Sequence, residues 1–379
     1  MGDIEGKSSA ELKNLDILKL DRRTFMKTVG ALGASAFMGT YAADIAKAIA
    51  ETDRNIVWLQ GAECTGCSVS LLNAEYPDVL QAVTDLKVAI QYHETLMPQQ
   101  GLFVDGVPVE DAALNANYAL EHFLDSGKPF VLVVEGAIPL GPDGTGNYCK
   151  IGDESFLHIT QKAAEKALIT VAAGTCAAYG GIPATPPNPT DAVGLQFLKT
   201  TKGGALGAGY VSQAGLPVIN IPGCPSHPDW VLLTLTAALL DLIPTDFLDE
   251  FQRPKMFFNP DYTIHENCPR RGFYDMGKLD TEYAGGKCLW KLGCRAMLSH
   301  ADCPTRLWNS GTSMCTQVGG PCIGCVEPTF PEGSLAVEVE GIPALVGVDI
   351  NTAALTATGA AAVGVGAHAL RRIVPSKED

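Results

Sequence analysis

Short, continuous runs of apolar residues mark the strands that the sequence predicts. Four such runs cover Ile56–Leu59, Phe130–Glu135, Ala167–Ala173 and Leu216–Ile221. Apolar runs of this length are typical of strands that are buried on both faces. Helical patterns lie between and after them, at Ser68–Asn73, Asp111–Leu124, Glu154–Lys166 and Trp230–Leu240. Alternating strands and helices predict an α/β fold with a doubly wound parallel sheet.

Cysteines follow three of these predicted strands within a few residues. The first strand leads into Cys64-Thr65-Gly66-Cys67, the third into Gly174-Thr175-Cys176 and the fourth into Pro222-Gly223-Cys224. Because the carboxyl ends of parallel strands meet at one edge of a sheet, ligands bind there. We therefore expect Cys64, Cys67, Cys176 and Cys224 to meet at this edge.

The regular pattern ends near Leu242, and the chain becomes rich in Pro, Gly, Asn and Cys. Such a loop-rich region needs covalent or metal cross-links to hold its shape. Two further sets of four residues stand out: His265, Cys268, Cys288 and Cys294, and then Cys303, Cys315, Cys322 and Cys325. Of the twelve cysteines, Cys149 alone is left over, and we interpret it as a packed thiol.

Three kinds of chemistry compete for these sets. Iron–sulfur clusters take four soft thiolates, with histidine as an occasional substitute. Zinc accepts the same ligands, and disulfides would also use cysteines. The sequence contains no GxSxG, HExxH or P-loop motif. A chain with redox-capable sites and no catalytic motif is best interpreted as an electron conduit whose active site lies on a partner.

Composition and charge exclude other classes of protein. Among the 379 residues, 46% are hydrophobic and 18% are charged, which is typical of a globular chain. The net charge of −15, without a basic cluster, makes nucleic acid an unsuitable partner.

The first fifty residues have the pattern of an export signal. Paired arginines in Asp21–Lys27 precede an uncharged run over Thr28–Ala43, and Ala48-Ile49-Ala50 offers a cleavage site. We interpret residues 1–50 as a twin-arginine signal peptide and expect the mature protein on the extracytoplasmic side. The alternative is a cytosolic amphipathic helix with a chance pair of arginines. That export route carries folded, cofactor-loaded proteins, which favours metal over disulfides.

The tail over residues 336–379 contains a second membrane signal. Residues 352–370 carry no charge except on His368, and two arginines follow them. This length suits a transmembrane helix with a basic cytoplasmic end. A flexible Ala/Gly tail or a surface helix is the alternative. His368 would be either a haem ligand in a membrane partner or a histidine at the helix end, and we favour the second interpretation.

Nine motifs, from about Asn55 to Gly333, resemble the small subunit of nickel–iron hydrogenases. In order they are GAECTGC, YHETLM, EGAIP, GTCAAYGGIPA, PGCPSHPDW, IHENCP, LGC, ADC and PCIGCVEP. The resemblance implies a flavodoxin-like domain over residues 51–241 and a cluster-binding domain over residues 242–335. It also implies a large subunit as partner, with the Ni-Fe site on that subunit.

The resemblance further implies three iron–sulfur clusters in a line. The proximal cluster would use Cys64, Cys67, Cys176 and Cys224, the distal cluster His265, Cys268, Cys288 and Cys294, and the medial cluster Cys303, Cys322 and Cys325. Electrons from H2 would pass through them in the order proximal, medial, distal. The acceptor would be a cytochrome b or c, or a quinone-linked membrane protein.

Two departures from the common family pattern refine this expectation. Cys315 falls where most members have a proline, as in the nickel–iron–selenium branch, so the medial cluster is expected to be [4Fe–4S] rather than [3Fe–4S]. An unligated thiol is the alternative. Gly66 and Gly181 stand where oxygen-tolerant members carry extra cysteines. An ordinary proximal [4Fe–4S] cluster without that tolerance is therefore expected.

Glu63, His93 and His227 carry further expectations. Glu63 could accept protons or face the partner's active site, or it could be a plain surface glutamate. His93 and His227 match family positions, and we interpret both as structural. Two other functions stay open at this stage: a stand-alone exported iron–sulfur electron carrier, and a zinc-stapled binding module.

Overall fold

The computed structural model describes residues 54–75, 78–84, 87–99, 101, 103–239, 243 and 247–331. The predicted signal peptide and the tail with its predicted membrane helix lie outside these residues. No helix within the described ranges is long and apolar enough to cross a membrane.

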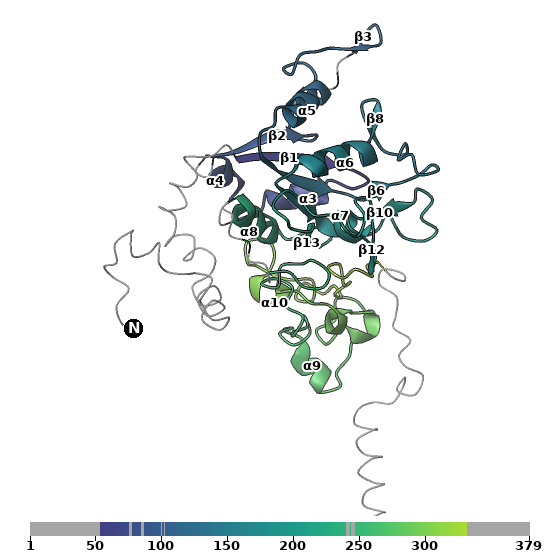
Figure 1. Cartoon of the computed structure of the whole chain (residues 1–379). Helices are drawn as coiled ribbons and strands as arrows, with labels where there is room; N and C mark the ends of the chain where they lie inside the picture. Colours follow the sequence, from purple (N-terminus) through teal and green to yellow (C-terminus); the bar gives the residue numbers. More distant parts are fainter. Residues whose placement is uncertain are drawn as a thin grey trace, which may run out of the picture.

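A five-stranded parallel sheet forms the centre of the fold (Figure 1). Its strand order is β13-β9-β5-β1-β2. Numbered along the chain, this is the 2-1-3-4-5 order of the flavodoxin-like doubly wound fold, which confirms the predicted fold class. The strands are β1 Arg54–Gln60, β2 Val88–His93, β5 Phe130–Glu135, β9 Ile169–Ala173 and β13 Ile219–Ile221.

Helices cover both faces of this sheet. One face packs Val57 and Leu132 against α5 (Ala116–Asp125) and α6 (Phe156–Lys166). The helices α3, α4, α7 and α8 span Gly66–Leu71, Val79–Thr84, Gly174–Tyr179 and Pro228–Leu239.

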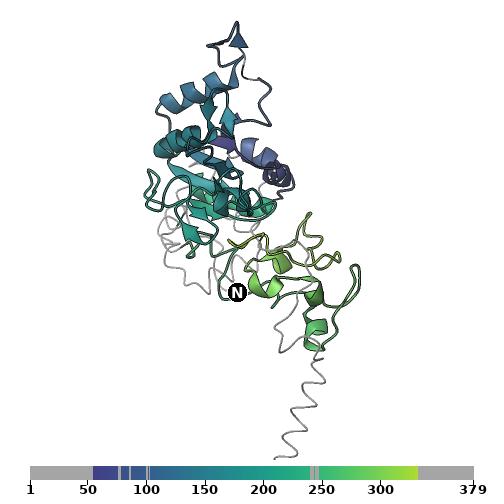
Figure 2. The ribbon, with the colours of Figure 1, turned by 90° about the vertical axis from the view of Figure 1, so that its right-hand side faces the viewer.

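The loop-rich C-terminal part shares the core that lies on the other face of the sheet, together with α8 (Pro228–Leu239). Trp58 and Val131 share one continuous core with Trp230 of α8, Phe258 and Leu289. The C-terminal part lies on one side of the sheet in both ribbon views (Figures 1 and 2). Its short helices are α9 Arg271–Asp275, η2 Trp290–Leu292, η3 Ala296–Leu298 and α10 Cys303–Arg306.

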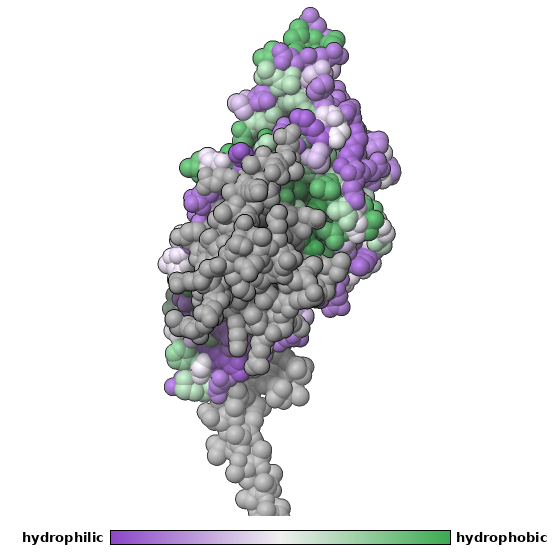
Figure 3. All heavy atoms as spheres, turned by 60° about the vertical axis from the view of Figure 1, so that its left-hand side comes forward, coloured by the Kyte–Doolittle hydropathy of each residue, from purple (hydrophilic) through white to green (hydrophobic). Residues whose placement is uncertain are grey.

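Four small antiparallel pairs complete the described strands. They are β3 Phe103–Val104 with β4 Val107–Pro108, β6 Ile138–Pro139 with β10 Ala192–Val193, β7 Lys150–Ile151 with β8 Glu154–Ser155, and β11 Phe197–Leu198 with β12 Thr201–Lys202. The β3–β4 hairpin projects at the top of Figure 1, and green apolar side chains show among purple ones at the top of Figure 3. Val104 and Val107 of this hairpin are exposed.

Predicted and observed boundaries differ where turns intervene. The predicted helix Asp111–Leu124 begins only at Ala116, because Asn115 caps it by accepting hydrogen bonds from the N–H groups of Asn117 and Tyr118. The predicted strand Leu216–Ile221 shortens to three residues. The sequence interpretation missed β2 and α4.

Candidate metal centres

The CxxC pair lies at the point of the sheet where the strand order reverses. β1 ends at Gln60. The next strand of the sheet along the chain, β2, lies on one side of β1, and the strand after that, β5, lies on its other side. Thr65 adopts a left-handed conformation (φ 59°) and starts α3, which leaves Cys64 exposed and turns Cys67 inward. Ligands of doubly wound sheets bind at such switch points.

Cys176 and Cys224 reach the same edge from two other strands. Burial raises the pKa of Cys176 to about 12, and the nearby thiols of Cys224 and Cys64 contribute to the rise. Burial also raises the pKa of Cys67, on which Cys176 and Cys224 act electrostatically. The four predicted residues of this first set therefore lie together.

Three glycines leave room for these sulfur atoms. A Cβ atom on Gly174 would lie 2.5 Å from the Sγ of Cys67, and one on Gly181 would lie 2.9 Å from the Sγ of Cys176. A Cβ atom on Gly66 would lie 3.0 Å from the Sγ of Cys64. The backbone thus forms a cradle that any side chain at these positions would narrow.

Glu135 is a site residue that the sequence interpretation missed. This carboxylate at the end of β5 is 2% exposed. It accepts hydrogen bonds from the N–H groups of Cys67 (2.9 Å) and Ser68 (3.1 Å), from the Ser68 hydroxyl, and from the indole N–H of Trp58 (3.1 Å). It therefore fixes the backbone on which Cys67 is carried.

The second set gathers in the loops around α9 and the two 3₁₀ turns. Burial raises the pKa of Cys288 to about 11, and Cys294 and Cys268 add to it electrostatically. His265 lies one turn before Cys268, whose N–H donates to the His265 carbonyl (3.1 Å). Its ring packs against Tyr274 at 4.8 Å between centroids. The structure brings the three cysteines together and places His265 beside Cys268.

The third set surrounds the start of α10 and the last described loop. Burial raises the pKa of Cys303, and Cys325 and Cys322 contribute. Cys315 is exposed, yet it acts electrostatically on both Cys322 and Cys325. Cys315 is therefore close enough to belong to this set.

The three sets adjoin one another in an order that differs from the sequence. The N–H of Cys224, in the first set, donates to the thiol of Cys325, in the third. The N–H of Cys322, also in the third set, donates to the Sγ of Cys294 in the second (3.4 Å). The third set therefore lies between the first and the second.

Thr175 joins the first and third sets through a further pair of hydrogen bonds. Its hydroxyl donates to the carbonyl of Cys325 and accepts from the N–H of Gly223 (2.8 Å). The flavodoxin-like sheet edge and the C-terminal loops are thus held together at the cysteines themselves.

The three cysteine sets fit iron–sulfur clusters better than they fit zinc ions or disulfides. All twelve cysteines are free thiols, so none forms a disulfide. Within the described residues, no three His, Cys, Asp or Glu side chains converge closely enough to hold a single metal ion. Sets of four soft ligands suit a cluster of several irons. Because burial disfavours thiolates, such sets are stable as ligands only when cations lie among them.

The remaining candidate residues have structural surroundings. The Nε2 of His93 contacts the Oγ of Ser68 (3.1 Å), and the ring stacks on Trp58. The Nε2 of His227 contacts the Leu307 carbonyl (2.6 Å). Cys149 packs against the core under α5 and α6. The structural roles of all three stay predictions.

Glu63 lies next to Cys64 of the first set, and its surroundings change the pKa of its carboxyl group. Burial raises the pKa of this carboxyl to about 7, and Glu135 adds to the rise. Its Oε1 accepts from the Thr65 hydroxyl (3.1 Å), whereas its Oε2 is buried without a hydrogen-bond partner in the structure.

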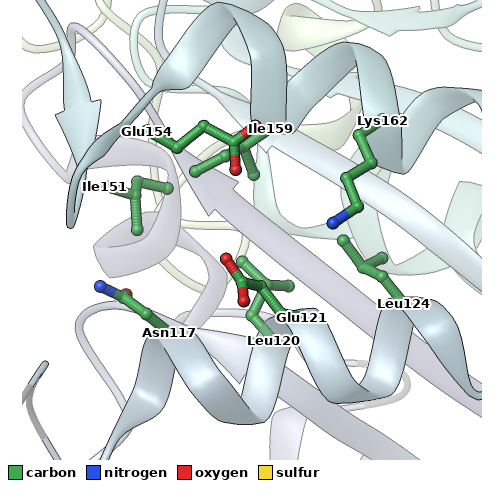
Figure 4. Close-up of a pocket in the computed structure, with 8 residues that line it drawn as sticks. All are labelled: Asn117, Leu120, Glu121, Leu124, Ile151, Glu154, Ile159 and Lys162. Carbon is green, nitrogen blue, oxygen red and sulfur yellow. The ribbon is translucent and has the colours of Figure 1, made fainter. Parts of the chain in front are cut away.

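A pocket between α5 and α6 is unrelated to the cysteine sets. Figure 4 shows Glu121, Glu154 and Lys162 at its rim, with Leu120, Leu124 and Ile159 beneath them. None of its lining residues is a cysteine or histidine.

Comparison with known protein families gives two matches. Residues 64–238 match the family described as NADH ubiquinone oxidoreductase, 20 Kd subunit. Residues 261–337 match the family described as the C-terminal part of the NiFe/NiFeSe hydrogenase small subunit.

Individual relatives and structures agree with these matches. The F420 non-reducing hydrogenase II small subunit of Methanosarcina mazei is 51% identical over 373 residues, covering 96% of this chain and 95% of the relative. The periplasmic [NiFeSe] hydrogenase small subunit of Desulfomicrobium baculatum is 36% identical, with coverages of 83% and 98%.

The structure of a reduced, active Ni-Fe-Se hydrogenase from that organism matches with a TM-score of 0.64 and 34% identity, covering 76% of this chain and all of that chain. An actinobacterial-type NiFe-hydrogenase from Ralstonia eutropha H16 matches with a TM-score of 0.66 and 31% identity, with coverages of 83% and 91%.

Proposed function

The chain belongs to the small-subunit family of the NiFe and NiFeSe hydrogenases, and we propose that it carries electrons between a large subunit and an external acceptor through three iron–sulfur clusters. The observation that carries this proposal is the continuous series of cysteine sets, each hydrogen-bonded to the next. When bound, the clusters would supply one-electron redox steps.

Each set would have one place in this route. Cys64, Cys67, Cys176 and Cys224 would hold the proximal cluster, next to the large subunit. Cys303, Cys315, Cys322 and Cys325 would hold the medial cluster. The distal cluster would use His265, Cys268, Cys288 and Cys294. With Cys315 as a fourth ligand, the medial cluster is [4Fe–4S]; without it, the cluster is [3Fe–4S].

The surface beside the proximal set suits a large protein partner. Val69 of α3 is 58% exposed, Leu72 directly after this helix is 67% exposed, and Ile182 is 46% exposed. The N–H of Ile182 donates to the thiol of Cys176, which places this apolar side chain next to the set. Exposed apolar residues around a buried centre are typical of a protein interface. We propose that these three side chains are buried against the large subunit.

The names of two relatives bear on the electron acceptor and on the location. The Methanosarcina mazei relative is named F420 non-reducing, so we expect this protein's acceptor to be a cytochrome b or c or a quinone-linked protein rather than F420. The Desulfomicrobium baculatum relative is named periplasmic, which supports export through the twin-arginine motif at Arg22 and Arg23. Replacing both arginines by lysine would then leave the protein in the cytoplasm.

Purification through a tag on this chain tests the function. We expect a nickel-containing protein to co-purify, about thirteen iron atoms per complex if all three clusters have four irons and the Ni-Fe site adds one, and H2-dependent reduction of a viologen dye but not of F420. Iron and sulfide without nickel or H2 oxidation would instead favour a stand-alone electron carrier. Zinc in place of iron would favour the zinc-stapled binding module.

Paired cysteine variants test the ligand assignment. Cys176→Ala should lower the iron content by about one cluster, or about four atoms. Cys149→Ala is the matched control, because this thiol lies outside the three sets and should leave the iron content unchanged. Equal iron loss in both variants would contradict the assignment.

A further inference from the structure

A buried threonine contacts the second cysteine set from the neighbouring loop. Thr316 is 1% exposed, and its Oγ1 lies 3.5 Å from the Sγ of Cys268. It directly follows Cys315 of the third set. The dipeptide Cys315-Thr316 therefore lies between two sets, with one residue contributing to each.

The position of this hydroxyl is fixed by its own backbone. The Nε of Arg270 donates to the carbonyl of Thr316 (2.5 Å). The same guanidinium donates through Nη1 to the carbonyls of Gly285 (2.8 Å) and Lys287 (2.5 Å). Arg270 thus ties Thr316 to the loop that carries Cys288, and the hydroxyl is held against Cys268 rather than free to rotate away with its loop.

Ligand chemistry decides the direction of the hydrogen bond. A free Cys268 thiol or the Thr316 hydroxyl could each be the donor. A cysteine that binds iron is a thiolate and has no proton to donate. The hydroxyl of Thr316 must then donate to the sulfur, and a charge-assisted hydrogen bond results.

We propose that Thr316 is a positioning residue that raises the reduction potential of the distal cluster by donating a hydrogen bond to its ligand Cys268. This inference rests on the proposed function. Reduction adds negative charge to a cluster and its thiolates, and a hydrogen bond to a ligand sulfur stabilises that charge. The distal cluster would thereby be kept at a potential suited to accepting electrons from the medial one.

The experiment is a redox titration of the purified complex, followed by electron paramagnetic resonance. Thr316→Val keeps the shape of the side chain and removes the donor, so the distal potential should shift downwards while the proximal and medial potentials stay unchanged. Thr316→Ser keeps the hydroxyl and should restore the wild-type potential. Thr160→Val is a matched control, because this buried hydroxyl has no partner and lies in the flavodoxin-like part.

A second readout does not depend on electron transfer. Vibrational bands of the iron–sulfur bonds should shift in D2O for the wild type and for Thr316→Ser, and this shift should be smaller for Thr316→Val. An unchanged distal potential and an unchanged D2O shift in Thr316→Val would overturn the proposal. Should that variant fail to assemble, Thr316→Ala is used for the same two measurements. A wild-type complex without a distal cluster would instead refute the proposed function itself.

Discussion

Replacing Glu135 by glutamine tests how the CxxC loop is held. The Glu135 carboxylate accepts four hydrogen bonds, two from backbone N–H groups, one from Ser68 and one from Trp58. Glutamine has nearly the same shape but offers only one accepting oxygen and carries no charge. If that oxygen serves the N–H groups of Cys67 and Ser68, the amide NH2 group faces the indole N–H of Trp58.

The expected cost follows from these contacts. Leaving the buried indole N–H of Trp58 without an acceptor costs about 1–3 kcal/mol. The two backbone hydrogen bonds change from a charged to a neutral acceptor, which weakens each by about 1 kcal/mol. The Glu135→Gln variant should therefore unfold about 3–5 kcal/mol more easily. For a chain of this size, that lowers the Tm by roughly 10 °C.

Thermal unfolding of the purified complex, followed by circular dichroism at one scan rate, measures this effect. Glu121→Gln on the exposed side of α5 is the control, because that side chain makes none of these contacts, and its Tm should match the wild type. Iron analysis of both variants reports whether the proximal site still fills. A Tm for Glu135→Gln within about 3 °C of the wild type would refute the reasoning, since it would mean that the four hydrogen bonds contribute little to stability.

Four further changes have defined outcomes. Burial raises the pKa of Glu94 to about 8. The wild type should therefore lose stability as the pH rises from about 4.5 to 8. In Glu94→Gln, the difference in Tm between pH 5 and pH 8.5 should be smaller than in the wild type. Cys315→Ala should give an oxidised complex with a strong [3Fe–4S] signal in electron paramagnetic resonance, which the wild type lacks; the same signal in both would contradict a ligand role. Glu63→Gln should slow H2 turnover if this carboxyl handles protons or contacts the partner's active site, and unchanged kcat would remove the role. Gly174→Ala should lower the iron content by about four atoms. The new Cβ would lie 2.5 Å from the Sγ of Cys67, and the φ of +87° disfavours alanine. Normal iron content would show that the loop can adjust.

The central strands could be predicted because their burial leaves a simple trace in the sequence. β1 and β5 lie inside the sheet, all their residues except Gln60 are buried, and each contains a continuous apolar run, at 56–59 and 130–134. The strand β2 is at the edge of the sheet, and only Val88, Tyr92 and His93 of its six residues are buried. Its burial pattern is too weak and too short to separate it from a loop, which is why the sequence interpretation missed it.

The first cysteine set was predictable for a different reason. The carboxyl ends of parallel strands share one edge, so Cys64, Cys67, Cys176 and Cys224 could be brought together without any knowledge of side-chain positions. Glu135 and Thr316 gave no such signal. Glutamate and threonine are common on surfaces, and the contacts that give these two a role reach residues 68 and 48 positions away.

The spatial order of the three sets could not be predicted from the spacing of the motifs. Along the chain, the residues from His265 to Cys294 come before those from Cys303 to Cys325. In space the later set lies in the middle, because Cys325 contacts Cys224 and Cys322 contacts Cys294. The motif spacing groups the ligands, but it carries no information on which group is central. The resemblance to the hydrogenase family implied that order.

A middle set that is joined to both neighbours by backbone N–H groups has a consequence for electron flow. The donors of Cys224 and Cys322 belong to the main chain, so no side-chain substitution removes them without moving the loop. The hydroxyls of Thr175 and Thr316 lie at the same two junctions and can be replaced singly. If the three sets hold clusters, changes at the first junction should alter transfer between the proximal and medial clusters, and changes at the second should alter the distal potential. The two threonines therefore allow each step of the proposed route to be perturbed separately, while every cysteine ligand stays in place.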